Sequence, residues 1–361
     1  MNDRCAPGRI CRRTAFACIG ICALLSLTVV PQTAMGQFSR YRVMTYNVEN
    51  LFDTCHDAGD DDFEFQPEAA RKWTGMRYWR KLDGICRVLA AAGGYMPVDM
   101  VALCEVENDS VVRDLCERTM LRRLEYRYMV TNSADARGMD VALLYQPERF
   151  KPLFRTDIHL PLMPGERPTR DVLHVGGLLP TGDTLDVLIC HLPSRRGGTR
   201  EAEMRRRRAA QALRRSADSI RRGRSRALLL MMGDFNDGYR SRSMAGCLGV
   251  ERIPDNCVLK DSALYVLSAN LKARDGICGT YKYRGVWNDL DQIIVSGTLL
   301  APHAAFRTRR DACRIFAPAF LTARDETQGG VRPRRTYLGP AYMGGISDHL
   351  PLLLDFEMRM P

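Results

Sequence analysis

Residues 228–237 read Leu-Leu-Leu-Met-Met-Gly-Asp-Phe-Asn-Asp, an apolar run that ends abruptly in polar residues. A short continuous apolar run is typical of a buried strand. Gly233 at its end permits a sharp turn of the backbone. Asp234 and Asn236 lie two positions apart, so they point the same way on an extended chain. The pair can offer oxygen atoms to a hard cation or to a phosphate, although Asp, Asn and Gly also build ordinary turns.

Three further apolar runs end in the same kind of polar cluster. Each has the length and composition of a strand, and we predict strands at residues 42–48, 97–104 and 184–190. The polar clusters that follow these strands begin at Asn47, Glu105 and His191. Polar residues that gather at strand ends predict one shared crevice.

The rest of the chain alternates helical segments with strand pairs. The apolar spacing predicts helices at 71–92 and 111–120, and a basic helix whose core stripe is Ala210, Leu213, Ala217 and Ile220. Further strands are predicted at 128–130, 140–145, 170–175, 289–296 and 350–356, with an irregular region at 239–279. This mixture predicts an α/β sandwich with mixed sheets. We find no linker or repeat in the sequence, so we expect a single large domain.

The first 36 residues differ from the remainder. Arg9, Arg12 and Arg13 precede an uncharged apolar run at 14–30, and small residues follow at 34–36. This order is typical of a secretory signal peptide, so we predict a signal at 1–36 and a domain at 37–361. We expect export to the periplasm or the medium, a monomer without an obligate protein partner, and no other membrane segment. An uncleaved anchor is the alternative.

Most of the excess positive charge lies in one segment. Without the four arginines and one aspartate of residues 1–36, the formal net charge of +11 becomes +8. Residues 200–226 alone hold eleven arginines and three acidic residues. A local basic stripe suggests an anionic partner such as a phosphate ester, a nucleic acid or a lipid headgroup. A solvated helix face is the alternative.

The cysteines do not indicate a metal site or a disulfide scaffold. Nine of them follow residue 36, without the paired spacing of zinc ligands. Cys104 and Cys190 end apolar runs, where a cysteine usually behaves as a small buried side chain. Cys247 and Cys257 form the one pair that we propose as a disulfide.

The strand-end residues together suit metal-assisted hydrolysis of a phosphate ester. They are Asn47, Glu49, Glu105, Arg170, His191, Asp234, Asn236, Asp291, Asp348 and His349. Oxygen ligands with only two histidines favour Mg²⁺, with Mn²⁺ or Ca²⁺ as alternatives. His349 can act as a general base that a carboxylate such as Asp291 orients. His191, Asn236 and Arg170 can donate to phosphate oxygens as charge builds up.

Six motifs in order resemble the endonuclease/exonuclease/phosphatase superfamily, which includes deoxyribonuclease I. They are Thr45–Asn50, Ala102–Glu107, Cys190–Ser194, Gly233–Asn236, Leu290–Ile293 and Ser347–Pro351. The match covers nearly all of residues 37–361. It implies a four-layer α/β sandwich, in which two mixed sheets pack face to face with helices outside.

The resemblance also implies roles for single residues. Asn47 and Glu105 would belong to the metal site, with Glu49 close by and Asp348 as a further metal or phosphate residue. His191 and Asn236 would contact the scissile phosphate, and Asp234 would orient the attacking water or help to hold a second ion. His349, oriented by Asp291, would act as base or as electrostatic stabiliser. We also expect phosphate contacts from Arg170, Ser194, Arg195 and Arg196, and a crevice that is electropositive on the side of residues 195–208.

The leading functional hypothesis is an exported Mg²⁺-dependent phosphodiesterase, a nuclease acting on DNA or RNA. One alternative is a phosphomonoesterase, or a hydrolase of phospholipids or inositol phosphates, because these enzymes share the residues of phosphate hydrolysis. Another is a binding protein without catalysis. The presence of Glu105, His191 and His349 together weighs against that last alternative.

Overall fold

The computed structural model describes residues 38–195, 199–254 and 258–359, all within the compact unit Gly36–Pro361. Three expectations therefore lie outside the described residues: the signal peptide at 1–36, the phosphate contact of Arg196, and the disulfide that needs Cys257. No helix within the described ranges is long and apolar enough to cross a membrane.

Six strands form the first sheet, in the order β14-β19-β1-β2-β4-β3. They are β1 (Phe38–Leu51), β2 (Met100–Val106), β3 (Arg127–Val130), β4 (Asp140–Tyr145), β14 (Phe306–Ile315) and β19 (Leu352–Arg359). Neighbouring β1 and β2 run parallel, whereas the other neighbours in this sheet run antiparallel. The sheet is therefore mixed.

Seven strands form the second sheet, in the order β5-β6-β7-β8-β13-β10-β9. They are β5 (Lys151–Ile158), β6 (Val172–Leu178), β7 (Thr184–His191), β8 (Leu228–Asp234), β9 (Val250–Arg252), β10 (Leu264–Val266) and β13 (Asp291–Ser296). The neighbours β7/β8 and β9/β10 are parallel, so this sheet is mixed as well.

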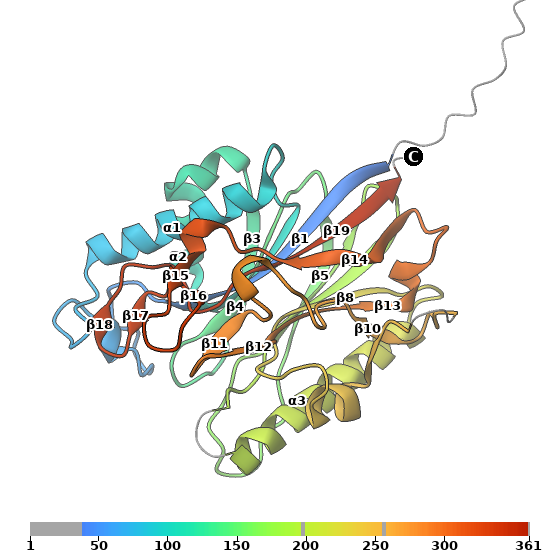
Figure 1. The fold of residues 1–361 in the computed structure, drawn as a ribbon. Helices are drawn as coiled ribbons and strands as arrows, with labels where there is room; N and C mark the ends of the chain where they lie inside the picture. The colour runs from blue at the N-terminus through green and yellow to red at the C-terminus, as the bar shows by residue number, and fades with distance from the viewer. Residues whose placement is uncertain (1–37, 196–198, 255–257, 360–361) are drawn as a thin grey trace, which may run out of the picture. The chain divides into compact units, whose positions relative to one another are not determined.

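The two sheets pack face to face, and helices cover their outer faces (Figure 1). The helices are α1 (Gly75–Gly93), the short α2 (Asp109–Arg113) and α3 (Thr199–Arg222). In Figure 1, α1 lies along the first sheet and α3 along the second. The four-layer sandwich predicted from the sequence is confirmed. Three small hairpins lie outside the two sheets: β11 (Tyr281–Tyr283) with β12 (Val286–Asn288), β15 (Thr322–Arg324) with β16 (Val331–Pro333), and β17 (Tyr337–Leu338) with β18 (Ala341–Tyr342).

Strand β8 shows why its sequence is apolar without interruption. Leu230 and Met232 pack between the sheets, whereas Leu229 and Met231 pack against α3. Successive side chains of a strand point to opposite faces, so a strand covered on both sides needs apolar residues at every position. The predicted stripe of α3 packs on this outer face, with Leu213 fully buried.

Several predicted elements differ from those observed. Helix α1 begins at Gly75 rather than at residue 71, because Trp73 is buried in the preceding loop and donates its indole N–H to the Phe52 carbonyl at 2.9 Å. The helix predicted at 111–120 is divided into α2 and a π-helical turn, Asp114–Arg118. Strands β5 and β14 were not predicted. Both are polar edge strands, so they lack the apolar run that marks a central strand.

Candidate active site

Three polar side chains reach the space between the sheets because of side-chain alternation. The residues of β8 that face the first sheet include Met232, so Asp234 faces it too. The same alternation along β7 ends in His191, which is the register partner of Asp234. On the other side of β8, Asp291 opens β13 directly opposite Asp234. Three adjacent strands thus present one histidine and two carboxylates at one edge.

Gly233 permits the close approach of β7 and β8 at this edge. Its φ is 144°, and a Cβ atom built there would lie 1.9 Å from the carbonyl oxygen of Cys190. A side chain has no space at this position, so only glycine fits. Gly233 lies within β8 rather than in the turn that the sequence suggested, and the contact between the two strands is what requires a glycine there.

Glu105 enters the site through a local irregularity of β2. The register between β2 and its neighbours shifts after Cys104, and Glu105 has a φ of 65°. A bulge of this kind redirects one side chain out of the regular alternation. The Glu105 carboxylate then accepts hydrogen bonds from the Asn50 backbone N–H at 2.9 Å and from the Asn47 amide at 3.1 Å.

Asn47 joins the two sheets within the site. Its buried amide nitrogen donates to Glu105 at 3.1 Å and to Oδ2 of Asp234 at 3.0 Å. Its own oxygen accepts the backbone N–H of Glu49 at 2.9 Å. A single side chain therefore fixes the distance between a carboxylate of the first sheet and one of the second.

Two groups of side chains among the described residues have the spacing of cation ligands. One contains Glu105, His191 and Asp234, and the other contains Asp234, Asp291 and His349. Burial and the nearby Asp291 raise the pKa of Asp234 to about 7. A bound cation would offset this crowding of carboxylates. The oxygen-rich set at Glu105, Asn47 and Asp234 therefore fits a hard divalent ion.

His349 is paired with Asp291. Nδ1 of His349 lies 2.7 Å from Oδ2 of Asp291, and both side chains are buried. Burial lowers the pKa of His349, but the carboxylates of Asp291, Asp234 and Asp348 outweigh it and hold the pKa well above its usual value. Ser347 fixes the backbone of His349 relative to β1, because its hydroxyl donates to the Asn47 carbonyl at 2.6 Å and accepts the His349 backbone N–H at 3.0 Å.

His191 has the opposite electrostatic environment. Its Nε2 lies 3.9 Å from Glu105 and 3.8 Å from Asp234, and the ring is buried. Burial, together with the positive charges of Arg170 and Arg137, holds the pKa of His191 well below its usual value. His191 is therefore the neutral imidazole of the site, and His349 is the charged one.

These side chains line a cavity of about 510 Å³, the catalytic cavity. Its walls are formed by Asn50, Glu105, Arg137, His191, Ser194, Arg195, Asp234, Asn236, Tyr281, Tyr283, Asn288, Leu290, Asp348 and His349. The ring of Tyr281 stands 4.8 Å from that of His349 and forms part of one wall. The arrangement brings a metal-type carboxylate, a neutral histidine and a charged histidine–aspartate pair to one solvent-accessible point.

A family model described as "Endonuclease/Exonuclease/phosphatase family" matches residues 42–358. The chain belongs to the endonuclease/exonuclease/phosphatase family. Members of this family are phosphoester hydrolases. The resemblance seen in the sequence is thus confirmed over almost the whole described structure. No curated protein sequence matches the chain significantly.

Solved structures share the fold of this family member. An endonuclease/exonuclease/phosphatase family protein from Bacteroides thetaiotaomicron has a TM-score of 0.55 at 16% identity, covering 89% of this chain and 96% of its own. The mannosyl-6-phosphatase of the same organism also has a TM-score of 0.55 at 16% identity, covering 88% and 99%. TDP2 of D. rerio, complexed with a single-stranded DNA product, has a TM-score of 0.53 at 16% identity, covering 88% and 99%.

Glu49 is not brought together with the other expected metal residues. Its carboxylate accepts the backbone N–H of Thr336 at 2.7 Å, and Arg335 lies 3.9 Å away. Burial and the charge of Asp348 raise the pKa of Glu49 to about 7. The backbone of Glu49 has a φ of 53°, which turns this side chain toward the 335–337 loop instead of the cavity. Asp348 does line the cavity, where it forms an ion pair with Arg335.

Asn236 lies in the cavity wall, and its amide donates to the Leu192 carbonyl at 2.9 Å. Arg170 lies behind His191 rather than in the cavity wall. Its guanidinium donates to Asp135 and to the Leu192 carbonyl, both at 3.1 Å. The expected phosphate contact of Arg170 stays a prediction. Its hydrogen bond to the Leu192 carbonyl shows that it helps to fix the segment after β7.

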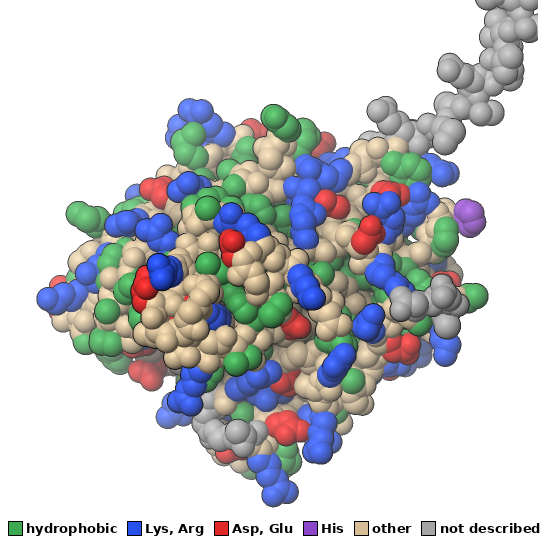
Figure 2. Space-filling view, viewed as in Figure 1, with side chains coloured by type: hydrophobic (Ala, Val, Ile, Leu, Met, Phe, Trp, Pro, Cys, Tyr) green, Lys and Arg blue, Asp and Glu red, His purple; other side chains and the backbone are tan. Residues whose placement is uncertain are grey.

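The arginines of residues 195–208 lie in several different environments. Arg195 lines the cavity and donates to the Asn236 carbonyl at 2.9 Å, and Ser194 lines the cavity beside it. Arg206 is buried against Asp237 at 2.8 Å, and Arg208 pairs with Glu166. Figure 2 shows basic side chains spread over the viewed face, interspersed with acidic ones. Among the described arginines of residues 195–208, Arg195 lines this cavity, and the electropositive crevice stays a prediction.

The sequence analysis gave no role to Arg137, Asn50 or Tyr283, although all three line the cavity. Arg137 is a single basic residue in the loop before β4, without a motif around it. Tyr281 and Tyr283 alternate on β11, and both point toward the site as residues two apart on a strand do. That period of two was the available signal for the hairpin.

Proposed function

We propose that this family member is a divalent-metal-dependent phosphodiesterase that cleaves nucleic acid. The observation that carries the proposal is the convergence of Glu105, His191, Asp234 and the Asp291–His349 pair on one cavity. A set of metal-type carboxylates beside two histidines of different charge suits attack of water on a phosphate. The same set has no evident structural purpose, because burying so many ionisable groups destabilises a fold.

Asn47 and Glu105 are the residues that would hold the ion, with Asp348 and Asp234 nearby. A bound Mg²⁺ would supply charge stabilisation at the phosphate oxygens, and Mn²⁺ or Ca²⁺ suits the same oxygen ligands. Within the protein, the Asn47 amide holds Glu105 and Asp234 at a fixed separation. Preorganised groups of this kind need no rearrangement as the reaction proceeds.

We assign contact with the scissile phosphate to His191 and Asn236. Both line the cavity close to Asp234, which is the register partner of His191 and accepts the backbone N–H of Asn236. Asn236 is held by the Leu192 carbonyl, which also accepts from Arg170, so the segment after β7 is fixed from two directions. A neutral His191 can donate one N–H to a phosphate oxygen while its position is maintained by packing.

We assign to Asp234 the orientation of the attacking water and the acceptance of its proton, and to His349 the stabilisation of charge on the phosphate. Asp234 accepts the Asn236 backbone N–H at 2.8 Å, which fixes its carboxylate for orienting a water molecule. His349, charged through its pair with Asp291, can donate to a phosphate oxygen or to the leaving oxygen. Of the two roles that the family resemblance left open for His349, base or electrostatic stabiliser, this pairing favours the second.

Nucleic acid is the substrate that the cavity walls favour. Arg137 and Arg195 supply positive charge, whereas Tyr281 and Tyr283 supply aromatic surface. Cationic side chains interleaved with aromatic rings are typical of single-strand binding, because every nucleotide has both a phosphate and a stacking face. A small phosphate monoester would use only part of this lining. We further propose that residues 1–36 direct export and that residues 37–361 act as a monomer.

The proposal is tested with purified wild-type protein and the His349→Ala variant. Each is incubated with supercoiled plasmid, RNA, bis-p-nitrophenyl phosphate and p-nitrophenyl phosphate, with Mg²⁺ or with EDTA. We expect strand cleavage that EDTA and the substitution both abolish. His159→Ala is the matched control, since His159 is exposed and binds Asp171 away from the cavity. Hydrolysis of p-nitrophenyl phosphate with intact nucleic acid would contradict the proposal and indicate a phosphomonoesterase.

A further inference from the structure

A second cavity, of about 400 Å³, adjoins the catalytic cavity, and we call it the arginine pocket. The two cavities share Arg137 and Ser194 in their walls. Arg167, Arg170 and Arg205 line the arginine pocket alone. The shared walls place the two cavities next to each other.

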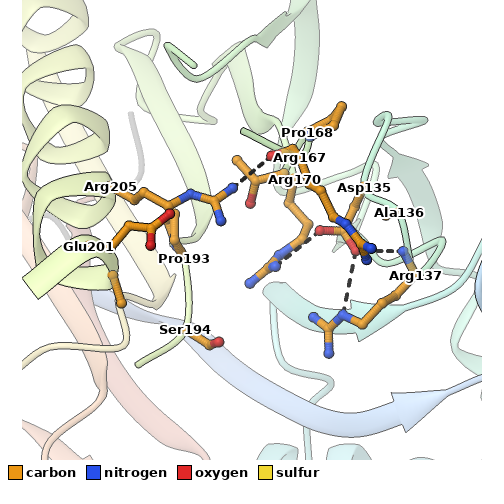
Figure 3. A pocket seen from close by; sticks show the side chains of 12 residues that line it. Asp135, Ala136, Arg137, Arg167, Pro168, Arg170, Pro193, Ser194, Glu201 and Arg205 are labelled. Atoms are coloured by element: carbon orange, nitrogen blue, oxygen red, sulfur yellow. Dashed lines mark hydrogen bonds and ion pairs between the residues drawn. The ribbon is translucent and has the colours of Figure 1, made fainter. Parts of the chain in front are cut away.

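Four separate segments build the pocket, at residues 135–137, 167–170, 193–194 and 201–205 (Figure 3). Arg205 and Glu201 project from α3 on one side, while Asp135 and Arg137 stand on the other. Arg167 and Arg170 come from the loop between β5 and β6. These arginines come from segments far apart in the sequence, so the pocket differs from the exposed face of a single basic helix. It is a concave site with a positive lining.

The lining of the pocket keeps a net positive charge despite two acidic side chains in its wall. Four arginines face two carboxylates there. Asp135 is neutralised within the pocket, because Arg170 lies 3.1 Å and Arg137 lies 3.7 Å from its carboxylate. Like charges in a concave site repel one another, and an anion would relieve the repulsion.

Fixed contacts hold the guanidinium group of Arg205 and the backbone at Arg167 in place. Arg205 donates to the Arg167 carbonyl at 2.7 Å. Arg208 forms an ion pair with Glu166, the residue before Arg167. The loop between β5 and β6 is thereby fastened to α3 at two points. Preorganised guanidinium groups lose little freedom when they bind an oxyanion.

Two buried donors point to a missing ligand at this site. Oγ1 of Thr169 and Nε of Arg170 are buried and lack hydrogen-bond partners among the described residues. Both residues line the pocket, and each is at least nine-tenths buried. A buried donor without a partner costs free energy, so a native structure normally satisfies it with protein, water or ligand.

We propose that the arginine pocket binds a phosphate group of a nucleic acid strand beyond the scissile phosphate. The inference rests on the proposed function and adds to it a second anion subsite and a direction for the strand, from the catalytic cavity toward α3. Guanidinium groups match the geometry of phosphate oxygens. A substrate with a single phosphate would fill one cavity and leave the other without its anion.

Equilibrium binding in EDTA tests this subsite without turnover. The probe is a dye-labelled single-stranded thymidine hexanucleotide, followed by fluorescence anisotropy. The pocket variants are Arg205→Gln and Arg167→Gln, and Arg167 is exposed, so its substitution leaves the fold intact. Arg205→Lys keeps the charge. The matched control is Arg215→Gln, which removes the same charge from an exposed position of α3 outside both cavities.

We expect each pocket variant to raise the Kd by about tenfold, because a charge-assisted phosphate contact is lost. Arg205→Lys should recover part of this loss, and Arg215→Gln should change the Kd by less than about twofold. The slope of log Kd against log salt concentration should fall by about 0.7 in the pocket variants. Thymidine monophosphate should compete equally well against the wild type and the pocket variants.

Pocket variants that bind the hexanucleotide as Arg215→Gln does would overturn the inference. A wild-type protein that cleaves nucleic acid alongside such a result would leave the proposed function standing. Conversely, binding that depends on Arg205 and Arg167, in a protein that cleaves no nucleic acid, would support the subsite and refute the nuclease function.

Discussion

Nδ1 of His349 lies 2.7 Å from Oδ2 of Asp291, although the two residues come from segments of different sheets. Asp291 opens β13 of the second sheet, and His349 lies three residues before β19 of the first. Asn47 and Asp234 form a similar bridge at 3.0 Å. The contacts that assemble the site are therefore also contacts between the two sheets, so catalytic geometry depends on how the sandwich closes.

Replacing Asp291 with Asn should lower kcat by about 10²- to 10⁴-fold on bis-p-nitrophenyl phosphate, because His349 loses its charged partner. The measurement is steady-state kinetics with Mg²⁺, with circular dichroism as a check on folding. Asp289→Asn is the matched control, since Asp289 lies two residues earlier and outside the cavity wall. Equal losses in both variants would argue against the role of the pair.

Substitution of Glu105 by Gln should alter the Mg²⁺ dependence of activity, whereas the same substitution at Glu107 should not. Glu105→Gln should raise the Mg²⁺ concentration for half-maximal activity by at least about tenfold, because a metal-type carboxylate is lost. Burial, together with the neighbouring Asp53, Asp57 and Asp62, raises the pKa of Glu107 to about 9, so it is neutral at pH 7. Glu107→Gln should therefore leave the Mg²⁺ titration unchanged. An identical titration for Glu105→Gln and wild type would exclude Glu105 from the ion site.

Gly233→Ala should destabilise the fold by about 3 kcal/mol or more, because its Cβ would clash with the Cys190 carbonyl and its φ is strained for alanine. Urea unfolding measures this difference. A Cβ at Gly246 meets no atom within 4 Å, so Gly246→Ala should stay within about 1 kcal/mol of wild type. Comparable stabilities for the two variants would mean that β7 and β8 can separate at no cost.

Asp186→Asn should cost about 1–3 kcal/mol at pH 7, because Asp186 is buried and accepts from His174 and Arg224. Burial alone would raise the pKa of Asp186, but these two partners hold it below 3.8. A lowered pKa in the folded state stabilises the protein above the unfolded value, and the benefit disappears as the pH falls through the folded value.

The difference in unfolding free energy between wild type and Asp186→Asn should therefore shrink below pH 3.8. Urea titrations at pH 7 and in that acidic range measure it. The exposed Asp261 offers a control, and Asp261→Asn should change stability by less than about 0.5 kcal/mol at either pH. A cost for Asp186→Asn that stayed constant with pH would rule out this ionic contribution.

Strand-end residues were predictable from the sequence because buried strands carry an uninterrupted apolar pattern. The positions of His191, Asp234 and Asp291 follow from the alternation that precedes or follows them. Glu49 was not predictable in the same way. It lies two residues after Asn47 in the motif, but a left-handed backbone turns it toward the loop at Thr336, and no local sequence pattern indicates that turn.

The arginines of α3 illustrate a second limit. Residues 205–208 form an unbroken basic run, yet Arg206 is buried against Asp237 and Arg208 pairs with Glu166. Helical geometry predicts that neighbours in such a run face different directions, but the carboxylate that each one meets comes from a distant loop. Arg137 was missed for the same reason, because its place beside the cavity is set by tertiary packing alone.

The position of β19 in the chain determines when, during synthesis, the site around His349 can first form. This strand, residues 352–359, lies between β14 and β1, and His349 stands three residues before it. Synthesis must therefore pass residue 359 before β1 gains its second neighbouring strand and His349 its fixed position. A nascent chain that stops before His349 lacks both this histidine and β19, so it cannot assemble the proposed site.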